Sequence, residues 1–416
     1  MARVRLIILA VFLFLPGAAW PQGPVGPEFR VNTYTVSDQQ RPSVAADAAG
    51  NFVVVWASPG DGFGPGIFGQ RFSSAGIPLG MEFRINTYVT GTQTYPAVAS
   101  DGTGNFVVVW RSDGQDGWDD GVFGQRYDAS GSPLGAEFRV NAFTSFDQGS
   151  PAVAADSAGN FVVVWSSDSN QPPYGGPPIV MGQRYASSGS PLGTEFRVND
   201  TSVGVAPAVA MDPVGNFVVA WTKGQIGQPI DIAGRRFATT GAPLGPEFQI
   251  NTTANSYEVA PDVAVDASGN FVVVWFNGDV FGGLFGDLFG QRFSSNGAPL
   301  GPEFRVTTSP YDQLNLRVGS DAAGNFVVAW RSYAQDGSGQ GVFGQRYASD
   351  GTPLGTEFRV NTHTTLDQKS PAVAADPAGN FVVVWECQSQ DGSGNGVFGQ
   401  RYRPIVPVEL TRFGVD

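Results

Sequence analysis

The chain contains few of the residues on which most known catalytic motifs depend. Its 416 residues include one cysteine, Cys387, and one histidine, His363. A single cysteine excludes an intramolecular disulfide framework and a zinc site built from several thiolates, and a single histidine excludes a site with several imidazole ligands. No Gly-x-Ser-x-Gly elbow and no His-Glu metal motif occurs. The sequence therefore offers no local catalytic motif.

Basic residues are also scarce, because 24 Lys and Arg stand against 37 Asp and Glu, for a net charge of −13. An acidic chain of this kind is an improbable partner for nucleic acid. Glycine (56) and proline (30) are abundant, yet 42% of the residues are apolar and 12% are aromatic. Such a composition argues against disorder and for a folded, turn-rich protein.

Residues 1–22 have the pattern of a secretory signal peptide. Arg3 and Arg5 precede the apolar run Leu6 to Leu15, which is followed by small residues at 17–19. This run is too short to cross about 30 Å of hydrocarbon as a helix, and no later segment is apolar enough to do so. We therefore expect export, to the exterior, the cell surface or the periplasm, with no transmembrane segment in the mature chain.

The dominant feature of the sequence is a repeat of about 55 residues. The segment Gly-Asn-Phe-Val-Val occurs seven times, beginning at Gly50, Gly104, Gly159, Gly215, Gly269, Gly324 and Gly379. Each copy also carries Gly-(Gln/Arg)-Arg-(Phe/Tyr) and Glu-Phe-x-(Val/Ile) segments. Nearly every residue after the signal belongs to one of these copies, which indicates a repeat architecture.

Each copy predicts four short strands, which in the first copy are residues 42–47, 51–57, 66–72 and 82–86. The first strand is rich in alanine, the second is apolar on both faces, and the fourth alternates apolar and polar residues. The strands of a copy thus change from a first strand that suits a crowded place to a fourth strand that is half-exposed. The strands of a β-propeller blade change in the same way from the axis to the rim.

The two ends of the repeat array complement each other. A fourth-type strand, residues 28–32, precedes the first full copy, and the last copy stops after its third strand. Pairing these ends would remove an exposed sheet edge. The sequence predicts an all-β, seven-bladed β-propeller of four-stranded antiparallel blades over residues 23–403, closed by an N-terminal strand that completes the C-terminal blade. We expect a monomer, with 404–416 a tail that packs on the ring or begins a further domain.

The repeat pattern Pro-Ala-Val-Ala-x-Asp-x-x-Gly-Asn-Phe-Val-Val-x-Trp, Gly-Gln-Arg-Phe and Gly-x-Pro-Leu-Gly-x-Glu-Phe-x-Val-Asn resembles repeats of exported and cell-surface bacterial proteins, including adhesin-like chains. The resemblance covers residues 28–402. In general design the chain is also similar to seven-bladed propellers such as integrin-type heads and some lectins. The resemblance implies a surface location and carries no established activity.

Residues shared by all copies are best explained by the fold. The seven repeat tryptophans are expected in the core, and the arginine of the third strand is expected to pair with the glutamate that opens the fourth. By contrast, the connections between second and third strands and between blades vary, and both emerge on one face. Because function concentrates on variable loops of a rigid scaffold, we expect ligand contacts there.

The candidate ligand-binding residues are few. They comprise one acidic loop with an added tryptophan, a tyrosine in the next loop, and two charged residues at equivalent positions of neighbouring inner strands: Asp113, Asp116, Trp118, Asp119, Asp120, Tyr174, Asp262 and Arg317. The acidic loop offers oxygen ligands for Ca²⁺ and a platform for a sugar, but it lacks the alternating spacing of a calcium loop, so a solvated loop is the alternative. Asp262 and Arg317 are expected to neutralise each other, with a polar ligand site as the alternative.

These features lead to a ranked expectation about function. The first is a non-catalytic exported binding or adhesion scaffold that presents its variable loops to a glycan or protein at the cell envelope or matrix. The alternatives are a polysaccharide-acting hydrolase or lyase that uses loop carboxylates, and a purely structural surface module. No cofactor is expected, with Ca²⁺ left open.

Overall fold

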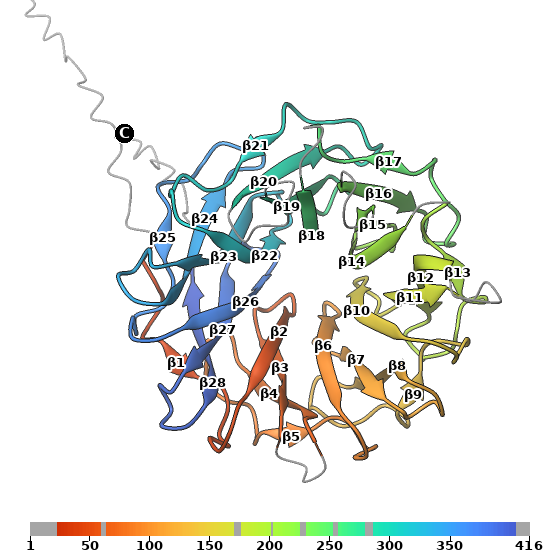
Figure 1. The fold of residues 1–416 in the computed structure, drawn as a ribbon, viewed down its shortest axis with the longest axis horizontal. Helices are drawn as coiled ribbons and strands as arrows, with labels where there is room; N and C mark the ends of the chain where they lie inside the picture. The colour runs from red at the N-terminus through yellow and green to blue at the C-terminus, as the bar shows by residue number, and fades with distance from the viewer. Residues whose placement is uncertain are drawn as a thin grey trace, which may run out of the picture.

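The computed structural model describes residues 23–59, 64–169, 176–200, 203–224, 230–252, 257–278 and 286–404. They form a closed ring of seven four-stranded antiparallel sheets (Figure 1). The predicted seven-bladed β-propeller is therefore confirmed. Within these ranges there is no helix long and apolar enough to span a membrane. The predicted signal peptide and all but the first residue of the predicted tail lie outside the described residues.

Each blade runs from an inner strand at the central channel to a very short outer strand. Blades 1 to 4 consist of β2 (Gln40–Ala46), β3 (Phe52–Ser58), β4 (Gly66–Phe72) and β5 (Phe83–Arg84); β6 (Gln93–Ser100), β7 (Phe106–Asp113), β8 (Asp120–Tyr127) and β9 (Phe138–Arg139); β10 (Gln148–Ala155), β11 (Phe161–Ser169), β12 (Gly176–Tyr185) and β13 (Phe196–Arg197); and β14 (Gly204–Met211), β15 (Phe217–Lys223), β16 (Asp231–Phe237) and β17 (Phe248–Gln249).

Blades 5 and 6 follow the same order, and blade 7 takes its outer strand from the N-terminus. Their strands are β18 (Tyr257–Val265), β19 (Phe271–Gly278), β20 (Gly286–Phe293) and β21 (Phe304–Arg305); β22 (Gln313–Ser320), β23 (Phe326–Tyr333), β24 (Gln340–Tyr347) and β25 (Phe358–Arg359); and β26 (Gln368–Ala375), β27 (Phe381–Gln388), β28 (Asn395–Tyr402) and β1 (Phe29–Arg30). The outer strands are shorter than the sequence predicts.

The ring closes as the sequence predicts. Strand β1 pairs antiparallel with β28, with Phe29 opposite Gly399. The amide of Val31 donates to the carbonyl of Val397 at 2.8 Å, and the Val397 amide donates to the Asn32 side chain at 2.7 Å. The first and last segments of the ring therefore share one sheet.

The antiparallel order gives the ring two unlike faces. The turn face carries the connections between the first and second strands of each blade and between the third and fourth. On this face Asp47 Oδ1 accepts the amides of Ala49 and Asn51, while Oδ2 accepts the Asn51 side chain. Gly50 has a φ of +76°, which a turn of this kind requires. The loop face carries the connections between second and third strands and between blades.

Repeated polar residues join neighbouring blades, which differs from the prediction. The guanidinium of Arg71 donates to the carbonyl of Ala129 in the next blade, and Arg401 closes the ring by donating to Ser74. Glu82 accepts the amide of Thr33 from the preceding blade at 2.6 Å. The expected pairing of Arg71 with Glu82 within a blade is therefore wrong, because each side chain satisfies backbone groups of a different neighbour.

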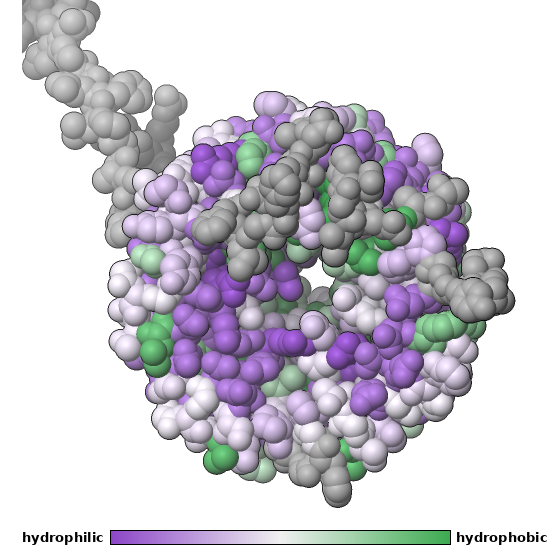
Figure 2. All heavy atoms as spheres, in the orientation of Figure 1, coloured by the Kyte–Doolittle hydropathy of each residue, from purple (hydrophilic) through white to green (hydrophobic). Residues whose placement is uncertain are grey.

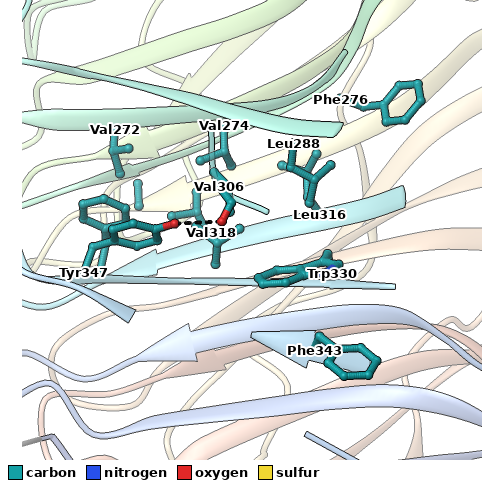
Figure 3. Packing of buried hydrophobic residues seen from close by; sticks show 13 residues of the cluster. Val272, Val274, Phe276, Leu288, Val306, Leu316, Val318, Trp330, Phe343 and Tyr347 are labelled. Atoms are coloured by element: carbon teal, nitrogen blue, oxygen red, sulfur yellow. Dashed lines mark hydrogen bonds between the residues drawn. The ribbon is translucent and has the colours of Figure 1, made fainter. Parts of the chain in front are cut away.

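The core lies between blades, where the apolar face of one sheet meets the next (Figure 3). Between blades 5 and 6, Val274 and Leu288 face Trp330, which is fully buried as predicted for the repeat tryptophans. The Tyr347 hydroxyl donates to the Val306 carbonyl at 3.0 Å across the same interface. A blade is therefore covered on both faces only inside the closed ring.

The single cysteine lies in this core and is expected to be unreactive in the folded protein. Cys387 is fully buried and accepts the Gln368 side chain at 3.7 Å. Burial raises the pKa of its thiol to about 12, so the nucleophilic thiolate is nearly absent at neutral pH. We expect alkylation to be slowed by at least ~100-fold relative to the unfolded chain. Mass spectrometry after iodoacetamide treatment measures this, and rapid labelling without denaturant would contradict it.

Candidate functional site

Each inner strand is interrupted near its loop-face end by a β-bulge. The register between first and second strands shifts in all seven blades, as between Thr94 and Ala97 in blade 2. One bulge residue in each blade has φ between 49° and 55°, which is uncommon for a residue other than glycine: Arg41, Tyr95, Ser150, Ala206, Ala260, Asn315 and Ser370. Bulges redirect side chains, so these seven positions form a ring at the loop-face mouth of the channel.

The amide of a bulge residue is held by the preceding blade. In three blades the acceptor is the side chain that follows the repeat tryptophan. Ser166 accepts from the Ala206 amide, Thr222 from Ala260, and Glu386 from Arg41 at 2.7 Å. The residue after each tryptophan therefore belongs to the same mouth as the bulge residues.

The charged members of this mouth are confined to one arc. Blades 3 to 5 contribute small or apolar residues at these positions, namely Ser150, Ser166, Ala206, Thr222, Ala260 and Phe276. Blades 6, 7, 1 and 2 contribute the charged residues and a tyrosine. We define the mouth cluster as Arg41, Tyr95, Arg111, Asp120, Arg331, Lys369 and Glu386. Figure 2 shows hydrophilic side chains gathered below and to the left of the central opening, over the blades that supply most of this cluster.

The centre of the mouth cluster is an exposed tyrosine between two arginines. The Arg41 guanidinium carbon lies 3.6 Å from the centroid of the Tyr95 ring, and that of Arg111 lies 5.1 Å from it. Arg41 also donates to the Thr94 hydroxyl at 3.2 Å. Tyr95 keeps 41% of its surface exposed. The arrangement presents one aromatic ring and two guanidinium groups to the loop face.

Two carboxyl groups lie on either side of this centre. Asp120 pairs with Arg111 at 2.9 Å and its side chain is 17% exposed, while the side chain of Glu386 is 4% exposed and lies 3.9 Å from Lys369. Burial raises the pKa of Asp120, opposed by Arg111 and reinforced by nearby acidic residues including Asp147. Burial also raises the pKa of Glu386 against the Arg41 amide, the Ser370 hydroxyl and neighbouring cations. Carboxyl groups whose pKa is raised above the ordinary range are candidates for proton transfer.

Exposed aromatic side chains also gather on the loop face. Among the described residues, every aromatic side chain that is largely exposed lies on this side of the ring: Tyr34, Tyr95, Trp118, Phe146, Tyr311 and Tyr333. The exposed apolar residues of the turn face are aliphatic, as Leu79, Met81 and Leu244 are. Aromatic rings with one open face are platforms on which sugar rings stack. The loop face is therefore the better surface for a glycan.

The structure brings only one residue of the predicted acidic loop into the mouth cluster. Asp120 begins β8 and contacts Arg111. Asp116 instead accepts the Asn141 side chain at 3.0 Å, which supports the next blade connection. Trp118 is 59% exposed, and Asp113 and Asp119 are exposed without joining the cluster. The loop thus divides its side chains between a contact with Arg111, support of the next blade connection and an exposed indole, and ligand binding by this loop stays a prediction.

The other predicted residues lie elsewhere or outside the described chain. Asp262 accepts the Val318 amide of the next blade at 2.8 Å, and burial raises its pKa while the charge of Arg317 opposes that shift. Arg317 is exposed and donates to the Leu316 carbonyl. Asp262 thus ties blades 5 and 6 together through a backbone amide, while the guanidinium of Arg317 is directed to a backbone carbonyl and forms no ion pair within 4.0 Å with Asp262. Tyr174 lies outside the described residues.

Sequence reasoning missed Arg41, Tyr95, Arg111, Arg331, Lys369 and Glu386. The signal was present in the sequence, because these residues depart from the repeat at three positions. Two of the positions are the two residues before the inner-strand proline, and the third is the residue after the tryptophan. Their convergence depends on the bulge and on contacts between blades. Neither is visible from the strand pattern alone.

No group of three or more Cys, His, Asp or Glu side chains that could hold a metal occurs in the part of the chain described. The calcium alternative for the acidic loop gains no support from these residues. Hollows also occur on the turn face, one of about 290 Å³ where the inner turns converge and others of about 400, 290 and 280 Å³ between blades. The hollows between blades recur at one place in the repeat, so we assign them to blade packing.

Comparison with known proteins identifies relatives in structure but not in sequence. No protein-family model matches the chain, and no curated protein matches it in sequence. A protein of unknown function from Dyadobacter fermentans is similar, with a TM-score of 0.55 and 11% identity over 90% of this chain and 97% of that one. The polysaccharide lyase Uly1 has a TM-score of 0.55 and 10% identity over 86% and 90% of the two chains.

A third similar structure is the GH93 α-L-arabinofuranosidase of Fusarium graminearum in complex with arabinobiose. Its TM-score is 0.50 with 9% identity over 75% of this chain and 93% of that chain. At such identities the likeness shows a common fold, here one that supports two glycan-acting enzymes. The expectation of a non-catalytic scaffold is corrected on this finding, because the fold from which it was inferred also occurs in glycan-acting enzymes. The physical reason for the error is that carboxyl, tyrosine and arginine side chains assembled from separate blades need no local sequence motif.

Proposed function

We propose that this protein is a polysaccharide-acting enzyme, a hydrolase or lyase, whose substrate lies across the loop face and reacts at the mouth cluster. The observation that carries the proposal is the concentration of exposed aromatic rings on the same face as a cluster with two carboxyl groups of raised pKa. Two glycan-acting enzymes with this fold support it. Export, which is predicted from residues 1–22, would place the enzyme with extracellular polymers.

Within this proposal Asp120 is the proton-transfer residue. Its side chain is 17% exposed, its pKa is raised chiefly by burial, and it pairs with Arg111, whose guanidinium carbon lies 5.1 Å from the centroid of the Tyr95 ring. A protonated carboxyl donates its proton to the glycosidic oxygen as the C–O bond breaks, and in hydrolysis the water that adds at the anomeric carbon returns a proton to the carboxylate. Glu386 is nearly inaccessible and binds the Arg41 amide, so we assign it as a positioning residue.

Replacement of Asp120 by Asn is expected to lower kcat by about 10²- to 10⁴-fold, because the variant cannot supply a proton. The raised pKa means that the wild-type acid form persists above the usual aspartate range. Activity should therefore be retained at low pH and lost as pH rises through that pKa. Release of reducing ends from a panel of neutral and acidic polysaccharides measures turnover, and ultraviolet absorbance of an unsaturated product distinguishes elimination from hydrolysis.

The matched control is Asp128→Asn, which makes the same change at a half-buried aspartate of the turn face that accepts the amides of Ser130 and Ser132. We expect its turnover to equal that of the wild type. Equal thermal midpoints for the variants separate a chemical effect from misfolding. Wild-type turnover in Asp120→Asn, or no turnover of any polymer by the wild type, would contradict the proposal.

A further inference from the structure

The substrate's chemistry can be inferred from one arginine of the mouth cluster. Arg41 is held in an uncommon backbone conformation, with φ of 55°, and its amide is tied to Glu386 at 2.7 Å. Its guanidinium stacks on Tyr95 at 3.6 Å and donates to Thr94 at 3.2 Å. The backbone and the side chain are therefore both fixed, so the group is preorganised.

Arg41 carries no carboxylate on its guanidinium. The ion pairs within 4.0 Å among the described residues are Arg111–Asp120, Lys223–Glu247, Arg235–Asp200, Arg305–Asp287 and Lys369–Glu386. Glu386 is the acidic group bound to Arg41, but it accepts the backbone amide and its own pKa is raised by burial. The chain has a net charge of −13. A fixed arginine without a carboxylate partner at the channel mouth is therefore a positive group in an acidic protein.

The charges around Arg41 reinforce this departure. Arg111 approaches the same tyrosine ring at 5.1 Å from its centroid. Lys369 lies 3.9 Å from Glu386. Arg331 has no carboxylate within 4.0 Å among the described residues, and the charges of Asp367 and Glu386 act on it from farther away. Two guanidinium groups thus lie within 5.1 Å of the centroid of the aromatic ring, and Asp120 is the acidic group paired to one of them, Arg111.

A guanidinium that stacks on a ring still has N–H donors free along its edge. Those donors match the two oxygens of a carboxylate, which is the geometry that arginine recognises best. The exposed part of Tyr95 lies beside them. We propose that the mouth cluster binds an acidic sugar unit of the polysaccharide, a uronate, with its carboxylate on the edge of Arg41. This inference rests on the proposed function and specifies its substrate class.

The test measures binding separately from turnover. Wild-type protein and variants are titrated by calorimetry with polygalacturonate oligomers, with the same oligomers after reduction of their carboxyl groups, and with sulfated dextran oligomers. We expect binding of the uronate, at least ~10-fold weaker binding of the reduced form, and ~10- to 100-fold weaker uronate binding by Arg41→Gln, because a charge-assisted hydrogen bond is lost. Arg41→Lys should restore part of the affinity, since it keeps the charge without the planar fork.

The matched control is Arg84→Gln, which removes an exposed arginine from the outer strand β5 and should bind as the wild type does. Equal binding of uronate and reduced oligomers, equal binding of sulfated dextran, or an unchanged affinity in Arg41→Gln would overturn the inference. Turnover of neutral polymers without uronate binding would also overturn it and leave the enzymatic proposal standing. Absence of turnover on every polymer would instead overturn the proposed function, while the Arg41→Gln titration would still decide the charge preference.

Discussion

A chain that begins at Tyr34 is expected to lose most of its stability relative to a chain that begins at Gly23. The shorter chain lacks β1, whose Phe29 ring lies 5.4 Å from that of Phe72, and the adjoining Val31, which is 2% exposed. Loss of one large core side chain costs about 3–5 kcal/mol, and whole proteins are stable by only about 5–15 kcal/mol. Denaturant titration followed by tryptophan fluorescence measures the loss.

Truncation has a second consequence, because it leaves β28 as an open sheet edge. The carbonyl of Val397 and the amide paired to Asn32 would lose their partners. Unpaired edges promote association between chains, so we expect the truncated protein to aggregate in sedimentation experiments. The controls are two point variants of the full ring. Val31→Asp should reproduce the destabilisation, and Arg30→Ala, at the exposed position of β1, should not. An unchanged unfolding midpoint after truncation would contradict closure by this strand.

Replacement of Trp330 by alanine is expected to destabilise the protein by about 3–5 kcal/mol. The side chain is fully buried between blades 5 and 6, in the cluster that includes Val274 and Leu288. Its removal forfeits the burial of a large apolar surface and leaves a cavity that neighbouring strands cannot fill without breaking their pairing. The free energy of unfolding by denaturant measures the effect.

The chain supplies a matched control in Trp118, which is 59% exposed on the loop face. Trp118→Ala makes the same chemical change where little surface is buried, so we expect it to stay within about 0.5 kcal/mol of the wild type. A loss in Trp118→Ala equal to that in Trp330→Ala would show that the exposed ring is structural. A negligible loss in Trp330→Ala would contradict the core assignment of the repeat tryptophans.

Sequence-based prediction of the fold succeeded for the strands, whose hydrophobic pattern repeats in every copy. The second strand, apolar on both faces, can be buried only between two other sheets, and seven copies make a ring the simplest way to cover every face. The fourth-type strand at residues 28–32 then predicts closure. The expected pairing of Arg71 with Glu82 failed because adjacency within a copy was used to infer a contact, whereas both side chains reach into neighbouring blades.

Prediction of the candidate site reached some of its residues. The variable loops, Asp120 and Trp118 lie on the same face as the mouth cluster, but Asp116 of the acidic loop supports the next blade connection instead of joining that cluster. The cluster around Tyr95 was missed because its members come from four blades and sit within strands, where a departure from the repeat is easily taken for tolerated variation. The inference of a non-catalytic scaffold failed for the same reason, since it depended on the absence of local motifs.

The amino-acid sequence alone determined the number of blades, the order of strands and the strand that closes the ring, because local hydrophobic patterns and their period leave one economical way to bury every apolar face. Only the tertiary structure decided which exceptional residues meet. Arg41, Tyr95 and Arg111 converge because bulges rotate side chains out of the strand alternation and because Glu386 of the preceding blade holds the Arg41 amide. Contacts between residues that lie 50 or more positions apart depend on three-dimensional registration, which no linear spacing encodes.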